Sequence, residues 1–168
     1  MFTPLVRILL IIGSLGMGIY FYTKSDFLNM AMIILCAVFF VYGYFKSGTV
    51  YIAHLALKKE DFDKAEKLIS KIKNPHLLSK GQKSYFHFTL GAIASNNKDW
   101  ETSYSEWTKA LNIGLRTEND ASIALLNLAN VELERKNFKK AHAFITKVRK
   151  LKLKPFVKSE TDNIENKI

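Results

Sequence analysis

The side chains best suited to metal binding or nucleophilic chemistry are four histidines and one cysteine, and they are scattered along the chain. Metal sites and nucleophile–base pairs place such groups at short, regular spacings, and no pair here has one. Cys36 lies within an apolar run, and the chain has no glycine-rich phosphate loop. We therefore expect no catalytic residue, no metal site, no cofactor and no enzymatic activity. The histidines are His54, His76, His87 and His142.

Two apolar runs predict a transmembrane hairpin over residues 1–46. Residues 5–22 contain one charged residue, Arg7, and residues 27–45 contain none. Runs of 18 and 19 residues approach the ~20 that a helix needs to cross the hydrocarbon core. The sequence TKSD between them is a polar turn. A cleaved signal peptide is the alternative, but the first run offers no convincing small-x-small cleavage site and a second run follows at once.

Basic residues beside the runs predict the orientation. They are more numerous after the second run than in the turn, so the positive-inside rule places both termini in the cytoplasm and the chain in the cytoplasmic (inner) membrane as a multi-pass protein. Arg7 can extend to the headgroups from near a helix end. The downstream lysines are Lys46, Lys58, Lys59, Lys64 and Lys67, and the tyrosines suited to the interfaces are Tyr20, Tyr22, Tyr42 and Tyr44.

Small residues in the first run, GSLGMG at 13–18, would allow close helix approach. Ser14 and Gly18 form a small-xxx-small pair. Two interpretations remain open: this face packs against the second run of the hairpin, or it docks onto another membrane protein.

Three segments of the remaining chain align without a gap at a period of 38 residues: 58–72, 96–110 and 134–148. A fixed period in this range is typical of stacked helices. Each segment is preceded by a helical stretch, at 49–59, 83–96 and 120–135. Trp100 and Trp107 occupy columns filled elsewhere by Phe and Ile, so we predict that both belong to the core. The aligned columns are Phe62, Trp100 and Phe138; Ile69, Trp107 and Ile145; Ala65, Ser103 and Ala141; and the capping candidates Asp61, Asp99 and Asn137.

At these residues the chain resembles the tetratricopeptide repeat family, whose repeat reads W-x2-L-G-x2-Y, then A-x3-F, then P. The middle unit has Leu90-Gly91 followed by Ser103-x3-Trp107, and the other two units have Ala53 and Ala129 in the column of Gly91. The resemblance implies an all-α fold, in which a right-handed superhelical stack of three helical hairpins over 47–152 follows the membrane hairpin. The units cover 48–78, 79–116 and 117–152, and a basic, flexible tail covers 153–168.

The resemblance also implies a groove lined by the first helix of each unit, which binds a protein partner. The donor clamp with which some family members hold acidic tails is absent, and the apolar and amide side chains here suit an amphipathic helix or an extended segment. The alternative is that a neighbouring unit or a C-terminal helix buries these residues. The groove positions are His54, Lys58, Tyr85, Phe88, Thr89, Ala92, Asn96, Leu126, Asn127, Asn130, Leu133 and Glu134.

Basic residues concentrate near the C-terminus. They suit either a solvated helix end or a contact with anionic lipid headgroups. Nucleic acid is excluded as a partner, because the lysines are spread, lack interleaved aromatic residues and follow a membrane anchor. The lipid candidates are Lys147, Arg149, Lys150, Lys152 and Lys154.

These features together predict a membrane-anchored adaptor or scaffold on the cytoplasmic face. Its partner would be another membrane protein or a peptide segment, and its role that of an assembly or accessory factor of an envelope complex. The alternative is a structural or regulatory subunit held through the hairpin, with the repeats as a brace.

Overall fold

The computed structural model describes residues 4–47 and 49–167, which form nine α-helices, one short 3-10 helix and no strand. The predicted all-α class is confirmed. Contacts divide the chain into two compact units, Met1–Gly48 and Thr49–Ile168, and we describe each by itself. Among the residues assigned to membrane interfaces, the side chains of Arg7, Tyr44 and Lys46 lie outside the described set.

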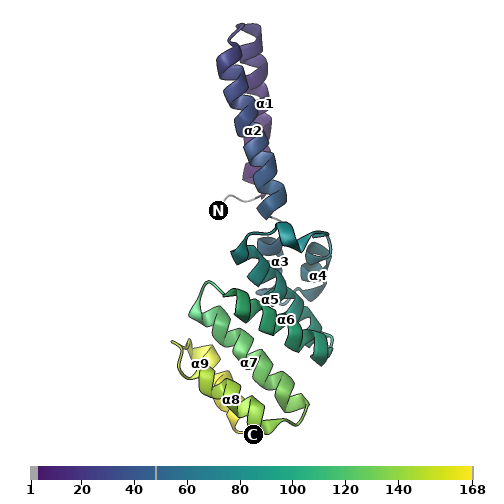
Figure 1. Ribbon diagram of the computed structural model, residues 1–168, viewed down its shortest axis with the longest axis vertical. Helices are drawn as coiled ribbons and strands as arrows, with labels where there is room; N and C mark the ends of the chain where they lie inside the picture. The colour runs from purple at the N-terminus through teal and green to yellow at the C-terminus, as the bar shows by residue number, and fades with distance from the viewer. Residues whose placement is uncertain (1–3, 48, 168) are drawn as a thin grey trace. The chain divides into compact units, whose positions relative to one another are not determined.

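The first unit is an antiparallel pair of helices, α1 (Pro4–Thr23) and α2 (Phe27–Ser47) (Figure 1). The chain reverses at Ser25, whose φ is 55°, and an Asp26 carboxylate oxygen accepts a hydrogen bond from the Asn29 N–H at 3.3 Å. None of the described side chains of this hairpin is buried. Within the residues that were placed, no helix combines the length and the apolar composition needed to cross a membrane.

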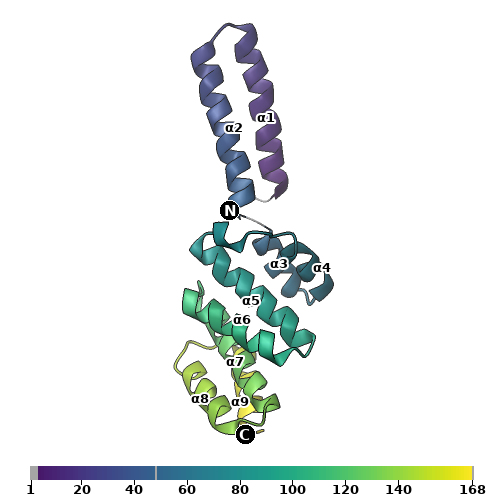
Figure 2. The same ribbon diagram turned by 45° about the vertical axis from the view of Figure 1, so that its right-hand side comes forward.

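The second unit contains three helical hairpins, seen in two views in Figures 1 and 2. The short 3-10 helix η1 (Pro75–Leu77) lies between the first and second hairpins. The first helices of the hairpins fall where the repeat alignment expects them. The hairpins are α3 (Val50–Leu57) with α4 (Phe62–Ile69), α5 (Lys80–Asn96) with α6 (Trp100–Ile113), and α7 (Glu118–Glu134) with α8 (Phe138–Val148).

Each hairpin is closed by a large side chain of its second helix that packs where the first helix carries a small residue. Trp107 is 1% exposed, and its ring atoms lie 2.9–3.1 Å from the position that a Cβ on Gly91 would occupy. Its Nε1–H donates to Ser95 Oγ at 3.1 Å. The prediction that Trp107 belongs to the core is confirmed. Trp100, the first residue of α6, is only half-buried.

The other hairpins use the same fit with different residues. Ala53 and Ile69 belong to one buried cluster, and Ala129 and Ile145 to another. All four are at most 4% exposed. The largest residue of the second-helix column, a tryptophan, therefore stands opposite the smallest residue of the first-helix column, a glycine.

The turns inside the three hairpins repeat one backbone motif at the same period. The residues with positive φ are Glu60, Lys98 and Lys136, at 61°, 59° and 59°. In the middle hairpin the Lys98 N–H donates to the Ser95 carbonyl and the Asp99 N–H donates to the Ala94 carbonyl, at 3.1 and 2.9 Å. This is the Schellman pattern that ends a helix in a left-handed residue.

The residue after each left-handed residue occupies the N-cap position of the next helix. The carboxylates of Asp61 and Asp99 accept from the Lys64 and Thr102 N–H groups, both at 3.1 Å, as predicted. Asn137 stands at the equivalent position, but its side chain makes no capping hydrogen bond. One position therefore serves both to end the first helix and to start the second.

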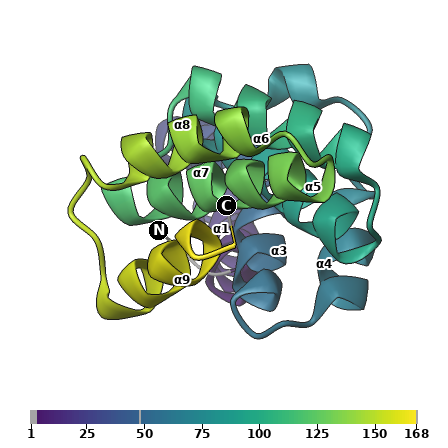
Figure 3. The same ribbon diagram turned by 90° about the horizontal axis from the view of Figure 1, so that it is seen from below.

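The predicted flexible tail is wrong, because residues 155–165 form a ninth helix, α9 (Pro155–Glu165). Pro155 at the start of a helix costs no hydrogen bond and presets φ. Val157 and Ile164 are 2% and 3% exposed and belong to one buried cluster with residues of α7 and α8. Figure 3 shows the course of α9 beside α7. Val157 and Ile164 lie seven residues apart, on one helical face. The tail is also not basic overall, because its three lysines are balanced by Glu160, Asp162 and Glu165.

We predict that Lys98→Gly stabilises the second unit by about 0.5–1 kcal/mol, because glycine adopts the left-handed conformation without the Cβ penalty. Thermal unfolding of the full chain in detergent would measure this. Asn97→Gly is the matched control. Its φ is −82°, so glycine there should destabilise, and equal effects of the two changes would contradict the assignment.

A second prediction concerns the fit of Trp107 to Gly91. Gly91→Ala should destabilise the second unit by roughly 1–3 kcal/mol, because the added methyl overpacks a buried indole. In a Trp107→Ile background the same change should instead stabilise by about 1 kcal/mol, the helix-propensity gain of alanine over glycine. The double variant reproduces the Ala–Ile pairs of the other hairpins. An unchanged sign in the second background would refute the proposed complementarity.

Candidate protein-binding surface

The predicted groove residues divide by exposure into three groups. Those on the buried side are apolar or aromatic for the most part, and those left exposed are polar. The buried ones are His54, Phe88, Thr89 and Leu126; the half-buried ones are Tyr85, Ala92, Asn127 and Leu133; the exposed ones are Lys58, Asn96, Asn130 and Glu134.

Three of these residues meet in one ring cluster between α3 and α5. The His54 ring lies edge-on to Tyr85, with centroids 4.8 Å apart, and edge-on to Phe88, at 5.2 Å. Phe88 in turn packs edge-on against Trp107 at 4.6 Å. Because Phe88 joins the hairpin core to this cluster, it is a packing residue and not an accessible anchor.

His54 is buried, but not all of its polar atoms are hydrogen-bonded. The residue is 7% exposed, and its Nδ1 atom is buried without a hydrogen-bond partner in the structure. Burial and the nearby Lys58 ammonium lower the pKa of His54, and Asp120 partly opposes them. His54 therefore favours the neutral form, in which its ring packs as an aromatic group.

Asp120 completes the cluster from α7, a role that no sequence pattern predicts. Its carboxylate accepts hydrogen bonds from the Tyr85 hydroxyl and from Thr117 Oγ1, the latter at 2.8 Å. Burial and the hydrogen bond to Asp120 raise the pKa of Tyr85 to about 12. Asp120 lies in the first turn of α7, where a carboxylate also suits the helix dipole. This network ties the second hairpin to the third.

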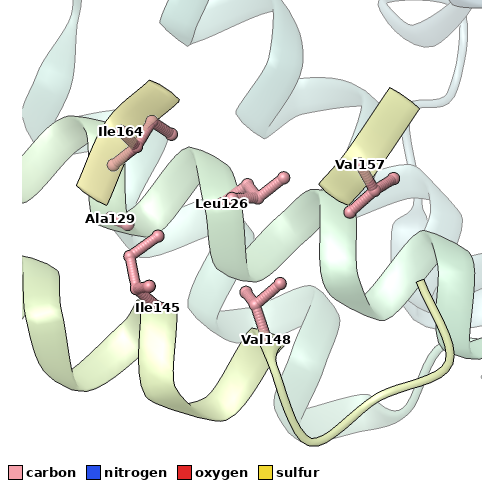
Figure 4. Packing of buried hydrophobic residues seen from close by; sticks show 6 residues of the cluster. All are labelled: Leu126, Ala129, Ile145, Val148, Val157 and Ile164. Atoms are coloured by element: carbon pink, nitrogen blue, oxygen red, sulfur yellow. The ribbon is translucent and has the colours of Figure 1, made fainter. Parts of the chain in front are cut away.

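In the third hairpin, α9 covers the apolar groove positions. Leu126 belongs to the same buried cluster as Val157 and Ile164, and Leu133 packs against that cluster. Figure 4 shows Leu126 between the two α9 side chains. The alternative in which a C-terminal helix buries these residues is therefore correct for this hairpin.

A polar strip remains exposed along the first helices, composed of Lys58, Asn96, Asn130 and Glu134. Lys58, Asn96 and Glu134 occupy one column of the repeat, at the C-terminal ends of α3, α5 and α7. Amide and charged groups in a row can hydrogen-bond an extended or helical segment, but they provide no apolar pocket to anchor it.

The basic residues near the C-terminus are all exposed, but they are not equally free. The Arg149 guanidinium donates to Asp162 at 2.9 Å and to Glu165, both on α9. These two carboxylates raise the pKa of Arg149. Arg149 therefore holds α9 in place. Lys147 lies 5.4 Å from the centre of the Phe144 ring.

Glu106 of α6 is a further titratable group and pairs with residues of α5 and α6. Glu106 is 2.6 Å from His87 Nδ1 and 2.5 Å from Lys109 Nζ. Burial alone would raise its pKa, but the hydrogen bonds from His87 and Lys109 lower it overall. Within the described part of the chain, no three His, Cys, Asp or Glu side chains are placed to share a metal ion.

Comparisons with known proteins give no match to a family model, to a curated protein or to a solved structure.

We predict that the second unit loses stability as the pH falls below about 6.5. The folded-state pKa of His54 is lowered from 6.5, so its contribution is complete above 6.5 and is lost as the pH falls toward the folded value. Between pH 7.5 and 5 the melting temperature of wild type should fall as the pH falls, and that of His54→Leu should fall less, because leucine has no group that must stay neutral in the core. His76 is exposed, so His76→Leu should leave the pH dependence of wild type unchanged; a flattened profile in that control would exclude His54 as the cause.

A further prediction tests whether α9 packs over the apolar groove positions Leu126 and Leu133. Ile164→Ala should destabilise α9 packing by about 2–4 kcal/mol, as other buried truncations do, and should speed amide exchange in α9 and at Leu126. The exposed neighbour Asn163 provides the control, because Asn163→Ala removes no packing. If the amides of α9 exchanged equally slowly in both variants, burial of Ile164 would not be what keeps α9 packed on the second unit.

Proposed function

We propose that the chain is a membrane-anchored adaptor that holds a protein partner at the cytoplasmic face and has no catalysis of its own. In this proposal the hairpin α1–α2 is the anchor, and the second unit is a short tetratricopeptide-like stack. The 38-residue period, the small first-helix column and the repeated hairpin turn support the second assignment.

The proposal that the hairpin is a membrane anchor rests on its exposed apolar side chains. Large apolar side chains on both helices stand more than half exposed, among them Ile19 at 68%, Leu28 at 76% and Phe39 at 74%. Such a surface is unfavourable in water and needs an apolar surrounding. The runs counted in the sequence also include Leu5 and Phe40, whose side chains lie outside the described set.

The distribution of Lys and Arg residues supports the proposed cytoplasmic location of both termini. Residues 46–168 carry 23 of the 25 Lys and Arg residues, and the lysines nearest the second run favour the cytoplasm for both termini. The second unit then lies in a reducing compartment, which agrees with a single cysteine that can form no disulfide within the chain.

The polar strip is the surface that we propose for the partner. It crosses all three hairpins, and most of the apolar groove positions are buried. The partner would then be an extended or helical segment that is rich in polar groups, recognised by the amides of Asn96 and Asn130 between Lys58 and Glu134. Repeat stacks commonly bind along such a row of equivalent positions.

A specific observation favours a second candidate function, a subunit held within the membrane. A Cβ built on Gly18 of α1 would lie 4.0 Å from Ile33 Cγ2 of α2, whereas among the described residues no atom of another segment lies within 4 Å of a Cβ built on Gly13 or Gly16. These two glycines are therefore not used to pack the hairpin. They would let the helix of another membrane protein approach closely.

We predict that the full chain resists carbonate extraction from membranes and that a C-terminal reporter is active only if it functions in the cytoplasm. Extraction by carbonate would overturn the anchor. A C-terminal reporter that functions only outside the cytoplasm, if active, would overturn the orientation.

Photocrosslinking would separate the two candidates. A crosslinker placed at Asn96 or Asn130 should give the same single product in native membranes. Asn112, exposed on α6, is the matched control and should give none. Loss of the product in a Gly13→Leu, Gly16→Leu chain that still inserts would instead favour the membrane subunit.

A further inference from the structure

We propose that the connection between the first two hairpins, residues 70–83, contacts the anionic headgroups of the bilayer that holds the anchor, with Leu77 reaching into the apolar layer. This inference rests on the anchor proposed above and adds the lipid class and the contact site. We refer to residues 70–83 as the basic connection.

The basic connection has an unbalanced charge. It contains Lys71, Lys73, Lys80 and Lys83 and no aspartate or glutamate. Lys71, Lys73 and Lys80 are exposed, and Lys83 is half-buried. The described ion pairs involve none of them. Lys80 and Lys83 also lie in the first turn of α5, where the helix dipole disfavours cations, so they do not serve the helix itself.

Adjacent leucines in the basic connection have opposite environments. Leu78 is 8% exposed and belongs to a buried cluster with Val50, Ile69 and Phe86. Leu77 ends the 3-10 turn Pro75–Leu77 and is 69% exposed. The buried leucine fixes the turn, and the turn presents the other leucine to the surroundings between lysines on both sides.

The basic connection begins close to Thr49, the first residue of the second unit. Thr49 Oγ1 donates to the Leu68 carbonyl at 2.7 Å, near the end of α4. Gly48 alone separates Thr49 from Ser47, the last residue of α2. Two residues span at most about 7 Å. If α2 ends at the membrane surface, the hydrogen-bonded end of the second unit is held near the headgroups.

A lipid surface fits these features better than a nucleic acid or an acidic protein. Lysines on an exposed turn provide diffuse positive charge without the planar pairing that arginine gives, and an exposed leucine among them gains free energy only in an apolar layer. The rival basic cluster near the C-terminus is less suited, because Arg149 is already paired with Asp162 and Glu165.

The test uses the full chain in Cys36→Ala form, reconstituted into phosphatidylcholine vesicles with and without phosphatidylglycerol. Leu77→Cys carries an environment-sensitive dye, and lipids with spin-labelled acyl chains quench a dye that reaches them. The control label is at Asn97, exposed at the other end of α5, which a helix of this length places about 25 Å away.

Two variants with equal loss of charge identify the lysines responsible. Lys71, Lys73, Lys80 and Lys83 are changed to Gln in one, and Lys147, Lys150, Lys152 and Lys154 in the other. A lysine near an anionic surface changes the bound-to-free ratio by about fivefold. We therefore expect the first variant to lower the quenched-to-unquenched ratio at residue 77 by more than about tenfold and the second to leave it nearly unchanged. Unchanged melting of both variants verifies their folding.

Three outcomes would overturn the inference, and they separate it from the anchor. A chain that stays in the vesicles while the dye at residue 77 remains water-like would refute the lipid contact and leave the anchor intact. Quenching that persists in the first variant, or is equal without phosphatidylglycerol, would refute the role of charge. A chain that carbonate removes from the vesicles would refute the anchor and the inference together.

Discussion

The packing of the second unit depends on one steric constraint, that two helices of a hairpin can approach closely only where one of them lacks a bulky side chain. Trp107 fills the space that Gly91 leaves, and Ile145 pairs with Ala129 in the same way. Core volumes must match to about a methyl group. The residue sizes in the two columns therefore vary in opposite directions, and the fit is preserved where the sequence changes.

This constraint could be predicted because it leaves a periodic trace in the sequence. The column of Ala53, Gly91 and Ala129 and the column of Ile69, Trp107 and Ile145 are visible at a period of 38 residues. They place the helices to within a few residues. The left-handed residues at Glu60, Lys98 and Lys136 also share this period, but their residue types do not reveal it. Glycine would mark such a position, whereas lysine and glutamate adopt it only because the hydrogen bonds on both sides require it.

The surface was harder to predict than the core, because exposure depends on which segments cover it. Phe88 and Leu126 lie on the helices expected to line a groove, yet Phe88 packs on Trp107 and α9 covers Leu126. No repeat column encodes α9, and its apolar residues are few. Asp120 was missed for a similar reason, since its partner Tyr85 is 35 residues earlier in the chain. Non-local contacts of this kind have no sequence period.

The way the stack ends determines which surfaces remain for function. An array of equivalent hairpins leaves its last apolar face open unless a further element covers it. Here α9 covers that face with only three buried side chains, Val157, Thr161 and Ile164, and Arg149 holds its outer side through two carboxylates. The cover removes apolar surface from the groove and neutralises an arginine of the C-terminal cluster. The polar strip along the first helices remains exposed, as do Lys71, Lys73 and Lys80 of the basic connection and the lysines near the C-terminus. The fold thus separates a hydrogen-bonding surface from a cationic one, and under the proposed membrane attachment the two would serve different contacts.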